Sequence, residues 1–448
     1  MNIDVQENFV APRSLKELLR SGDLDAAEAI FRQQIEIDPN DADGLLGLSA
    51  IMRKRRSRKD ARELLTKAAQ ARPIERSVEA DPKQLILRPR CLDSANYCAV
   101  GRPTGAIEFK FKGGHFALAH LLHGEKRNLV TANLVAGDPS PLHAAGKARL
   151  LLNTIACADR GRRSLKAVAQ YLREHPHLPA INRPQAVLRT TRDGNYQRLA
   201  GIRHTKFPKT LRVSLREGRA ALLATLAREE MTLPLILRAT GRQTGREVYL
   251  CSKLADIDCA LHALRRKRHV YAIAFTDCRR NGEMFHKARA FFIDGEVYPV
   301  AWLANDMWQI HSGDRYRVMA SSEHFQAMER HYLANPEAAC GKAAWQAIHD
   351  VGQALQLDFA GIDFTVSAAG ELFIFETNAA MRHNFDHGAR DRDDVTENVQ
   401  LRERMLARHA QHQDHAGIGA DGRRDRAQQT GAINEEDLHH IHRTASRS

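Results

Sequence analysis

The segment Leu357 to Asn378, LDFAGIDFTVSAAGELFIFETN, constrains the fold more than any other part of the sequence. It predicts two short strands joined by a turn at Ala368-Ala369-Gly370, where the glycine supplies the unusual backbone angle. Because side chains alternate along a strand, Asp363 faces away from its two apolar neighbours. On the second strand we expect one shared face for Leu372, Ile374, Glu376 and Asn378. A hairpin this apolar should be buried on at least one side.

Three oxygen-bearing side chains in this hairpin predict a cation site. Buried carboxylates are costly unless they are paired or bind a cation. Asp363, Glu376 and Asn378 offer two carboxylates and an amide oxygen, which are the ligands that a hard ion such as Mg²⁺ prefers. The alternative is a solvent-facing hairpin with acidic ends, and the segment alone does not decide between the two.

The spacing GxD, a short gap and then ExN resembles the metal-binding end of the ATP-grasp ligases. The resemblance implies that Asp363, Glu376 and Asn378 bind Mg²⁺, as two ions that Mn²⁺ can replace, and that ATP is bound beside them. It extends over roughly residues 85–387, and the parts occur in the order that the family has.

Length and composition limit the number of domains, the compartment and the kinds of partner that this chain can have. A chain of 448 residues is long enough for two or three domains. It has no long apolar run and no start typical of a signal peptide, so we expect a cytoplasmic protein with no membrane contact. The seven cysteines form no CxxC pair, which fits reduced thiols. The net charge of +13 favours anionic partners.

Residues 14–73 contain an internal repeat. Three positions return 34 residues later: Ala27, Phe31 and Pro39 as Ala61, Leu65 and Pro73. The segment resembles tetratricopeptide repeats, and an ordinary amphipathic helical extension is the alternative. About two units are visible, whereas such arrays need roughly three for stability of their own. We therefore expect the segment to dock on the next domain or on a peptide or protein partner.

The basic run RKRRSRK, Arg53 to Lys59, falls between two predicted helices. It can be a nucleic-acid patch or a localisation signal. A solvated turn is the favoured interpretation, since aromatic residues do not interleave with the basic ones. We therefore do not expect nucleic acid as a partner.

From about residue 85 the sequence alternates between strands and helices. Strands are predicted at 85–88, 128–135 and 150–156, a helix near 164–174, and a further short strand at 179–182. This order indicates a small parallel sheet. The predicted fold class is therefore α/β, with α+β lobes following the parallel sheet and an all-helical segment preceding it. Gly113-Gly114-His115 can cradle an anion at a helix N-terminus, although paired glycines at such turns also occur for steric reasons.

The resemblance implies a phosphate-binding set upstream of the hairpin. Arg192, with Arg189 as the alternative, and Arg238 stand where the family commonly has lysine. Arginine can recognise phosphate in a bidentate manner, but it is not interchangeable with lysine. The strand ending at Arg238 runs into a glycine-rich loop, for which the family implies contact with phosphates through Gly241, Thr244 and Gly245.

Two further strands complete the implied site. On the strand 269–277, the family places backbone contacts to adenine at Ile273, Ala274 and Phe275, and a ribose-binding acid at Asp277. On the strand that begins near 287, Lys287 and Arg289 face the same side and can reach one anionic group. The family implies that such a residue contacts the transferred phosphate or the acyl intermediate, and Arg289 is the first choice as catalytic residue.

The polar and aromatic connector Trp302 to Arg317 is a candidate wall for the carboxylate substrate. Its exposed candidates are Asp306, Trp308 and His311. A surface loop with a packed tryptophan is an equally good interpretation.

We therefore expect a helical segment at 1–80, an α/β lobe at 85–185 and nucleotide- and metal-binding lobes at 186–390. A polar, disordered tail is expected at 409–448, in which His439, His440 and His442 are solvated rather than metal-bound.

The implied function is ADP-forming ligation of a carboxylate to an amine, on a peptide, a carrier or a small molecule, with a homodimer common in the family. The alternative is an adaptor with a degenerate nucleotide site, which the arginines in lysine positions can signal.

Overall fold

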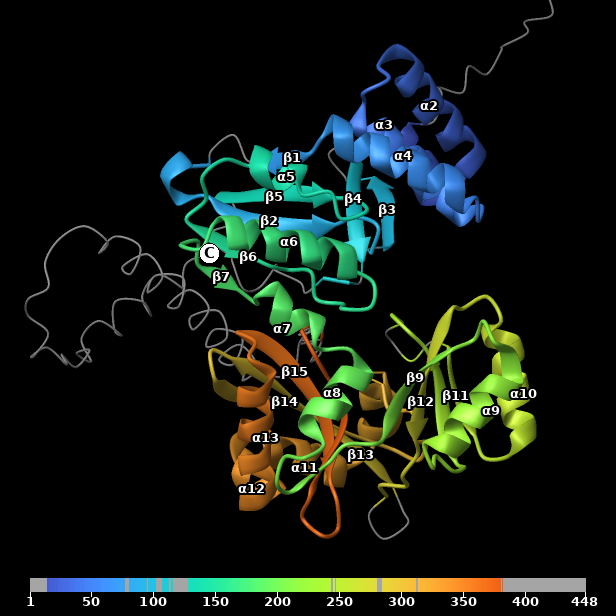
Figure 1. Cartoon of the computed structure of the whole chain (residues 1–448), viewed down its shortest axis with the longest axis vertical. Helices are drawn as coiled ribbons and strands as arrows, with labels where there is room; N and C mark the ends of the chain where they lie inside the picture. The colour runs from blue at the N-terminus through green and yellow to red at the C-terminus, as the bar shows by residue number, and fades with distance from the viewer. Residues whose placement is uncertain are drawn as a thin grey trace, which may run out of the picture.

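The computed structural model describes residues 14–76, 80–94, 96–101, 107–112, 114–115, 128–242, 245, 247–279, 284–311, 313–379 and 381. Gly113, Thr244 and the tail 409–448 with His439, His440 and His442 lie outside these residues. Within them the fold is mixed α/β, with an all-helical segment first, a small sheet next and two larger lobes after it (Figure 1).

The helical segment consists of α1 (Leu15–Ser21), α2 (Leu24–Ile37), α3 (Ala42–Lys54) and α4 (Arg58–Ala71). Helices α2 and α4 begin at residues 24 and 58, which is the 34-residue spacing of the sequence repeat. Ala27 and Phe31 of α2 are buried, as are their counterparts Ala61 and Leu65 in α4. The basic run lies at the turn between α3 and α4, where Arg55 pairs with Asp25 and Glu28.

This segment docks on the lobe that follows it, as the small number of repeats predicts. Apolar side chains of α3 and α4 share one core with Leu92, Tyr97 and Val135 of the next lobe. The Arg53 guanidinium lies 4.6 Å from the centre of the Tyr97 ring, a cation–π contact across the same boundary. The helical segment is thus anchored to the lobe rather than tethered by a linker.

The second part is built on a five-stranded sheet in the order β1-β5-β2-β6-β7. Its strands are β1 (Ile74–Arg76), β2 (Ile86–Cys91), β5 (Leu129–Leu134), β6 (Leu150–Leu152) and β7 (Ala180–Ile181). All neighbours are parallel except β1 and β5, which confirms the predicted parallel sheet. Helices α5 (Ser140–Ala144) and α6 (Arg162–Glu174) pack beside it, and α7 (Pro184–Leu188) leads onward. The hairpin β3 (Asn96–Gly101) and β4 (Ile107–Lys112) was not predicted.

Two sheets, whose strands are antiparallel apart from the pair β16 and β8, form the remaining lobes (Figure 1). The first has the order β11-β10-β12-β9, from β9 (Thr210–Ser214), β10 (Leu235–Ala239), β11 (Val248–Cys251) and β12 (His269–Ala274), with α9 (Gly218–Arg228) and α10 (Leu254–Leu264) against it. The second has the order β14-β13-β15-β16-β8, from β8 (Thr205–Lys206), β13 (Phe285–Ile293), β14 (Glu296–Asn305), β15 (Phe359–Val366) and β16 (Leu372–Asn378). Helices α8 (Arg192–Leu199), α11 (Glu323–Ala334), α12 (Pro336–Cys340) and α13 (Lys342–Leu355) belong to this part.

The predicted hairpin is β15 and β16, and it is deeply buried. Every residue of β15 is buried, and Asp363 is 6% exposed, so a solvent-facing hairpin is wrong. Gly370 adopts a φ of +77° in the predicted turn. The register breaks beside Asp363, which pairs with Glu376, whereas Phe364 pairs with Ile374. Our expectation that Ile374 and Glu376 share a face was wrong, because this β-bulge interrupts the alternation.

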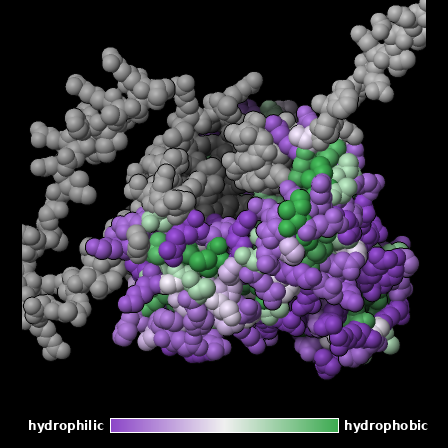
Figure 2. Space-filling view, turned by 90° about the horizontal axis from the view of Figure 1, so that it is seen from above, coloured by the Kyte–Doolittle hydropathy of each residue, from purple (hydrophilic) through white to green (hydrophobic). Residues whose placement is uncertain are grey.

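Apolar side chains are mostly internal. The face seen in Figure 2 is mainly hydrophilic, with hydrophobic side chains confined to small patches. No helix in the part of the chain described above is both long and apolar enough to span a bilayer.

The close packing of α2 against α3 gives a first prediction. A Cβ atom at Gly47 would lie 2.2 Å from Cζ of Phe31, inside a packed core, whereas at Gly44 the closest atoms are Asp41 Oδ2 at 3.0 Å and Ile35 Cγ1 at 3.2 Å. Gly47→Ala should lower the free energy of unfolding by about 1–3 kcal/mol through overpacking. Gly44→Ala in the same helix should change it by less than about 1 kcal/mol, because the gain in helix propensity is offset by tight contacts with Asp41 and Ile35. Chemical denaturation measures both, and equal effects of the two changes would contradict this packing.

Candidate functional site

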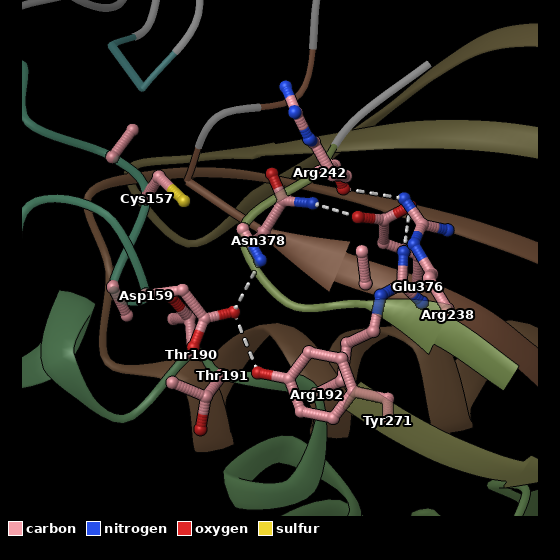
Figure 3. Close-up of a pocket in the computed structure, with 14 residues that line it drawn as sticks. Cys157, Asp159, Thr190, Thr191, Arg192, Arg238, Arg242, Tyr271, Glu376 and Asn378 are labelled. Atoms are coloured by element: carbon pink, nitrogen blue, oxygen red, sulfur yellow. Dashed lines mark hydrogen bonds and ion pairs between the residues drawn. The ribbon is translucent and has the colours of Figure 1, made fainter. Parts of the chain in front are cut away.

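A polar cleft forms where the parallel-sheet lobe and both antiparallel sheets meet (Figure 3). Its walls come from the loop after β6, from the start of α8, from β10 and its following loop, from β12 and from the end of β16. The lining residues are Ala156, Cys157, Ala158, Asp159, Thr190, Thr191, Arg192, Arg238, Ala239, Gly241, Arg242, Tyr271, Glu376 and Asn378.

Asp363 lies in the sheet next to two cations. Arg289, its register partner on β13, donates two hydrogen bonds to it, from Nε to Oδ1 at 2.7 Å and from Nη2 to Oδ2 at 2.9 Å. Lys287 Nζ lies 3.9 Å from Oδ2 and also donates to the carbonyl of Ile310. Burial alone would raise the pKa of Asp363, but Arg289 and Lys287 outweigh burial and hold the pKa below its usual value. The structure therefore keeps this carboxylate ionised.

Glu376 has a second set of cations. Arg192 Nη2 lies 2.6 Å from Glu376 Oε2, and the Asn378 side-chain amide donates to Oε1 at 2.8 Å. Burial would raise the pKa of Glu376, but the charges of Arg192 and Arg238 lower it below its usual value. The two predicted carboxylates and the predicted amide thus converge, as the register of β15 and β16 requires.

One arginine nitrogen in this cleft has unsatisfied hydrogen-bonding capacity. Arg238 Nε is buried and has no hydrogen-bond partner, whereas Arg192 Nη2 makes the ion pair with Glu376. Burial lowers the pKa of Arg238 to about 10, which leaves it protonated at neutral pH. Four cations, Arg192, Arg238, Arg289 and Lys287, surround the carboxylates of Asp363 and Glu376. Asp363, Arg289 and Lys287 do not line the cleft itself, whose charged lining residues are Arg192, Arg238, Arg242, Asp159 and Glu376. The lining therefore has more cations than carboxylates, which suits an anion.

The glycine-rich loop closes one side of the cleft. Gly241 has a φ of +68°, and its N–H donates to Asp159 Oδ2 at 3.2 Å. Arg238 Nη2 donates to the Arg242 carbonyl at 2.8 Å. Gly245 packs so tightly on His311 that a Cβ atom there would lie 2.3 Å from the imidazole ring. The loop thus touches both the parallel-sheet lobe and the connector that follows β14; Thr244 lies outside the described residues.

The strand predicted to bind adenine is β12. The N–H of Ala274 donates to the Lys209 carbonyl at 2.9 Å, and that of Phe275 to the Pro234 carbonyl at 3.2 Å. These two donors are therefore used within the protein. Ile273 pairs within the same sheet.

The other predicted residues lie around the entrance. Asp277 is exposed and paired with Arg279 at 2.5 Å, and Asp306 is exposed and 3.5 Å from Arg317. Trp308 packs edge-on against Phe275, with ring centres 5.9 Å apart. The connector therefore meets β12, but neither of these two aspartates lines the cleft.

Sequence reasoning missed Asp159, the residue that joins the lobes. Its carboxylate lies 2.6 Å from Arg212 Nη2, and it accepts a hydrogen bond of 2.7 Å from the Tyr271 hydroxyl (Figure 3). Arg212 in turn pairs with Asp193 and lies over the Tyr271 ring at 4.9 Å. A usable signal existed, because Asp159 follows the carboxyl end of a parallel strand, where ligand sites of such sheets are found.

The donor set limits which metal can bind. Among the residues described, no three His, Cys, Asp or Glu side chains come together as a metal cage. Asp363, Glu376 and Asn378 would leave several positions of an ion open. That fits Mg²⁺, which keeps water and binds substrate phosphates beside one or two carboxylates.

No family model and no curated protein sequence matches this chain. Solved structures do show likenesses. D-alanine–D-alanine ligase from Bacillus anthracis, complexed with ATP, aligns over 74% of this chain and 99% of its own, with a TM-score of 0.44 and 10% identity. N5-carboxyaminoimidazole synthase from Aspergillus clavatus aligns over 68% and 72%, with a TM-score of 0.41 and 14% identity.

A RimK-domain ATP-grasp protein from Sphaerobacter thermophilus aligns over 65% of this chain and 93% of its own, with a TM-score of 0.38 and 15% identity. The first of these structures is a ligase and the third an ATP-grasp protein, the family that the sequence resembles.

The Arg289–Asp363 pair predicts a specific pattern of stability. Arg289→Met leaves a buried carboxylate without its bidentate partner and should cost about 3 kcal/mol of unfolding free energy. Asp363→Asn in the same chain should recover a good part of that loss, because the orphaned charge is gone. Urea unfolding of the wild type, the two single variants and the double variant, without metal or nucleotide, gives the coupling free energy between the two residues. Strictly additive losses would contradict a direct pairing.

His311 predicts a pH dependence. Burial lowers its pKa from the ordinary value of 6.5, and the charge of Lys287 lowers it further. The unfolded chain therefore binds this proton more readily, so the stability from neutral His311 is present above about pH 6.5 and is lost as the pH falls. His311→Asn should remove this pH-dependent contribution to the free energy of unfolding. The stability curves of wild type and variant should differ by a constant above pH 7.5 and approach each other towards pH 5, whereas parallel curves would contradict the assignment.

Proposed function

We propose that this chain is an ATP-dependent, ADP-forming ligase that joins a carboxylate to an amine. One observation carries the proposal: buried arginines, among them Arg238 with an unpartnered Nε, converge on two ionised carboxylates beside a glycine-rich loop, between two sheets. A triphosphate with a hard cation is the ligand class that suits both halves of this arrangement.

In our proposal the cleft works by exchanging partners. Arg192 is paired with Glu376, and Arg289 with Asp363. ATP with Mg²⁺ offers each group a stronger partner, since phosphates would take the arginines and the cation would take the carboxylates. These side-chain groups are already ionised and held in place, so little reorganisation is needed when the ligand binds.

The proposed reaction has two steps. The substrate carboxylate attacks the γ-phosphorus of ATP, and the bond to the bridging oxygen breaks, which gives an acyl phosphate and ADP. The amine then attacks the acyl carbon, phosphate leaves and the amine loses a proton to solvent. Arg238 and Arg192 would hold the phosphates, and Arg289, with Lys287, would stabilise charge on the transferred group. No side-chain nucleophile is required.

Asp363, Glu376 and Asn378 would hold Mg²⁺ in this site. When bound, the cation would neutralise charge on the phosphate oxygens. Gly241 and Gly245 would let the backbone of their loop approach the phosphates. Ile273, Ala274 and Phe275 would line the adenine pocket; because two of their N–H groups are used within the protein, carbonyl oxygens there would accept from the adenine amino group. Asp277 would have to leave Arg279 to reach a ribose.

The connector residues Asp306, Trp308 and His311 would border the carboxylate substrate. Residues 14–73 would present a peptide or protein substrate, and a homodimer is compatible with the proposal.

Calorimetry of ATP binding tests the proposed function. Wild type should bind ATP with micromolar affinity in the presence of Mg²⁺ and more weakly without it. Glu376→Gln should abolish the metal dependence and reduce turnover at least about a hundredfold, as loss of transition-state charge stabilisation does. Glu371→Gln is the matched control, since Glu371 precedes the same strand and pairs with Lys206 outside the cleft.

Absence of ATP binding with and without Mg²⁺ would overturn the ligase and favour the degenerate adaptor. Full turnover in both Glu376→Gln and Asp363→Asn would instead overturn the metal assignment.

A further inference from the structure

The cleft between the lobes is too small for a nucleotide as it stands. Its volume is about 40 Å³, whereas sites for small molecules have roughly 300–1,000 Å³. A nucleoside triphosphate can therefore enter only if one wall of the cleft moves away from the others. The contacts that hold the walls together determine which groups must separate.

The Asp159 carboxylate joins the parallel-sheet lobe to the sheet of β9, β10, β11 and β12. Its Oδ1 accepts from Arg212 Nη2 at 2.6 Å, and its Oδ2 accepts from the Tyr271 hydroxyl at 2.7 Å and from the Gly241 N–H at 3.2 Å. Figure 3 shows the contact with Tyr271 inside the cleft. The side chain of Asp159 is only 13% exposed, so its charge depends on these partners.

The three donors form a set that suits a phosphate group. A guanidinium, a hydroxyl and the amide of a glycine-rich loop are groups with which proteins bind phosphate oxygens. In this structure a carboxylate of the chain itself accepts from all three. Tyr271 and Gly241 line the cleft, as Asp159 does. The carboxylate therefore lies where an anion in the cleft would meet these two donors.

The glycine-rich loop packs directly on the turn that contains Asp159. Gly241 has a φ of +68°, and a Cβ atom there would lie 2.8 Å from Arg160 Cγ and 3.5 Å from Asp159 Cβ. Glycine permits both this backbone conformation and this close approach. The loop thus rests against the parallel-sheet lobe, and the Gly241 amide is used by Asp159 rather than by a ligand.

We propose that Asp159 is an internal anion that keeps the cleft closed, and that an incoming phosphate chain must displace it from the Gly241 amide and the Tyr271 hydroxyl. For a nucleotide, the inference rests on the proposed ligase function, to which it adds a residue outside the reacting groups. Asp159 competes with the ligand, so it lowers the affinity for phosphates and makes binding depend on the opening of this wall.

Arg212 permits the exchange, because it has a second carboxylate partner. It donates to Asp193 from Nε at 3.0 Å and from Nη2 at 3.1 Å. Asp193 belongs to α8 and does not line the cleft. When Asp159 is displaced, the guanidinium is still paired with Asp193, which avoids the cost of a partly buried charge without a partner.

Hydrogen exchange of the ligand-free full chain tests the closing contact without turnover. Asp159→Ala removes the acceptor, and Asp159→Asn removes the charge at nearly constant size. The Gly241 amide should exchange about tenfold faster or more in Asp159→Ala, because local opening no longer has to break its hydrogen bond. Circular dichroism checks that both variants keep the fold.

Calorimetry tests the displacement. The probes are inorganic tripolyphosphate, which has neither base nor ribose, and ATP, each with Mg²⁺. Both variants should bind tripolyphosphate about tenfold more tightly than wild type, because the competing charged acceptor is gone. ATP binding should become tighter in the same two variants.

Asp193→Asn is the matched control, because it removes a carboxylate from the same arginine outside the cleft. It should leave the exchange of the Gly241 amide unchanged. Its affinity for tripolyphosphate should stay within about twofold of wild type, as expected for loss of a partly exposed ion pair.

The inference is overturned if the Gly241 amide exchanges equally fast in Asp159→Ala and in wild type. It is also overturned if neither variant binds tripolyphosphate more tightly than wild type, even where ATP binding shows that the proposed function holds. Tighter binding of tripolyphosphate by both variants, with no binding of ATP by any of the chains, would instead overturn the ligase and leave Asp159 as a competitor of phosphate.

Discussion

The pairing of buried carboxylates with arginines from distant segments is the interaction on which this structure depends. Asp363 and Glu376 are adjacent on one hairpin, and their partners come from β13 and from the start of α8. Neither carboxylate could stay ionised in this position without them, since burial favours the neutral form. The hairpin, the neighbouring strand and the helix are therefore held in one arrangement by charge as well as by apolar packing.

Asp159 extends the same principle to the parallel-sheet lobe. Its contacts with Arg212, Tyr271 and the Gly241 amide connect that lobe to β9, β12 and the glycine-rich loop. The loop also rests on His311, so both of its ends are in contact with other parts of the chain. Any movement that opens the cleft on this side must break these contacts, which makes the position of the loop sensitive to groups far from the hairpin in sequence.

Local patterns in the sequence predicted much of this. The two strands of 357–378 and the parallel strands were visible because each depends on neighbours within a few residues. The helical repeat was visible because three positions return at a fixed spacing of 34 residues. The bulge beside Asp363 was not, since it depends on the partner strand. Asp159 was missed for a related reason: its partners Arg212 and Tyr271 lie 53 and 112 residues away. The predicted role of Asp277 rested on resemblance and that of Asp306 on the polar composition of its connector, and both side chains lie outside the cleft lining.

Arginine in place of lysine has a physical consequence in this cleft. Burial lowers the pKa of Arg238 to about 10, which still leaves a full charge at neutral pH. A lysine starts from about 10.4 and loses its proton much more readily when buried. Lys287 shows the direction of that effect, since burial lowers its pKa even though Asp363 opposes the change. Arginine at 238 thus keeps its positive charge at a depth where burial would lower the pKa of a lysine from a lower starting value. The substitutions are therefore compatible with a working anion site, and they do not by themselves indicate a degenerate one.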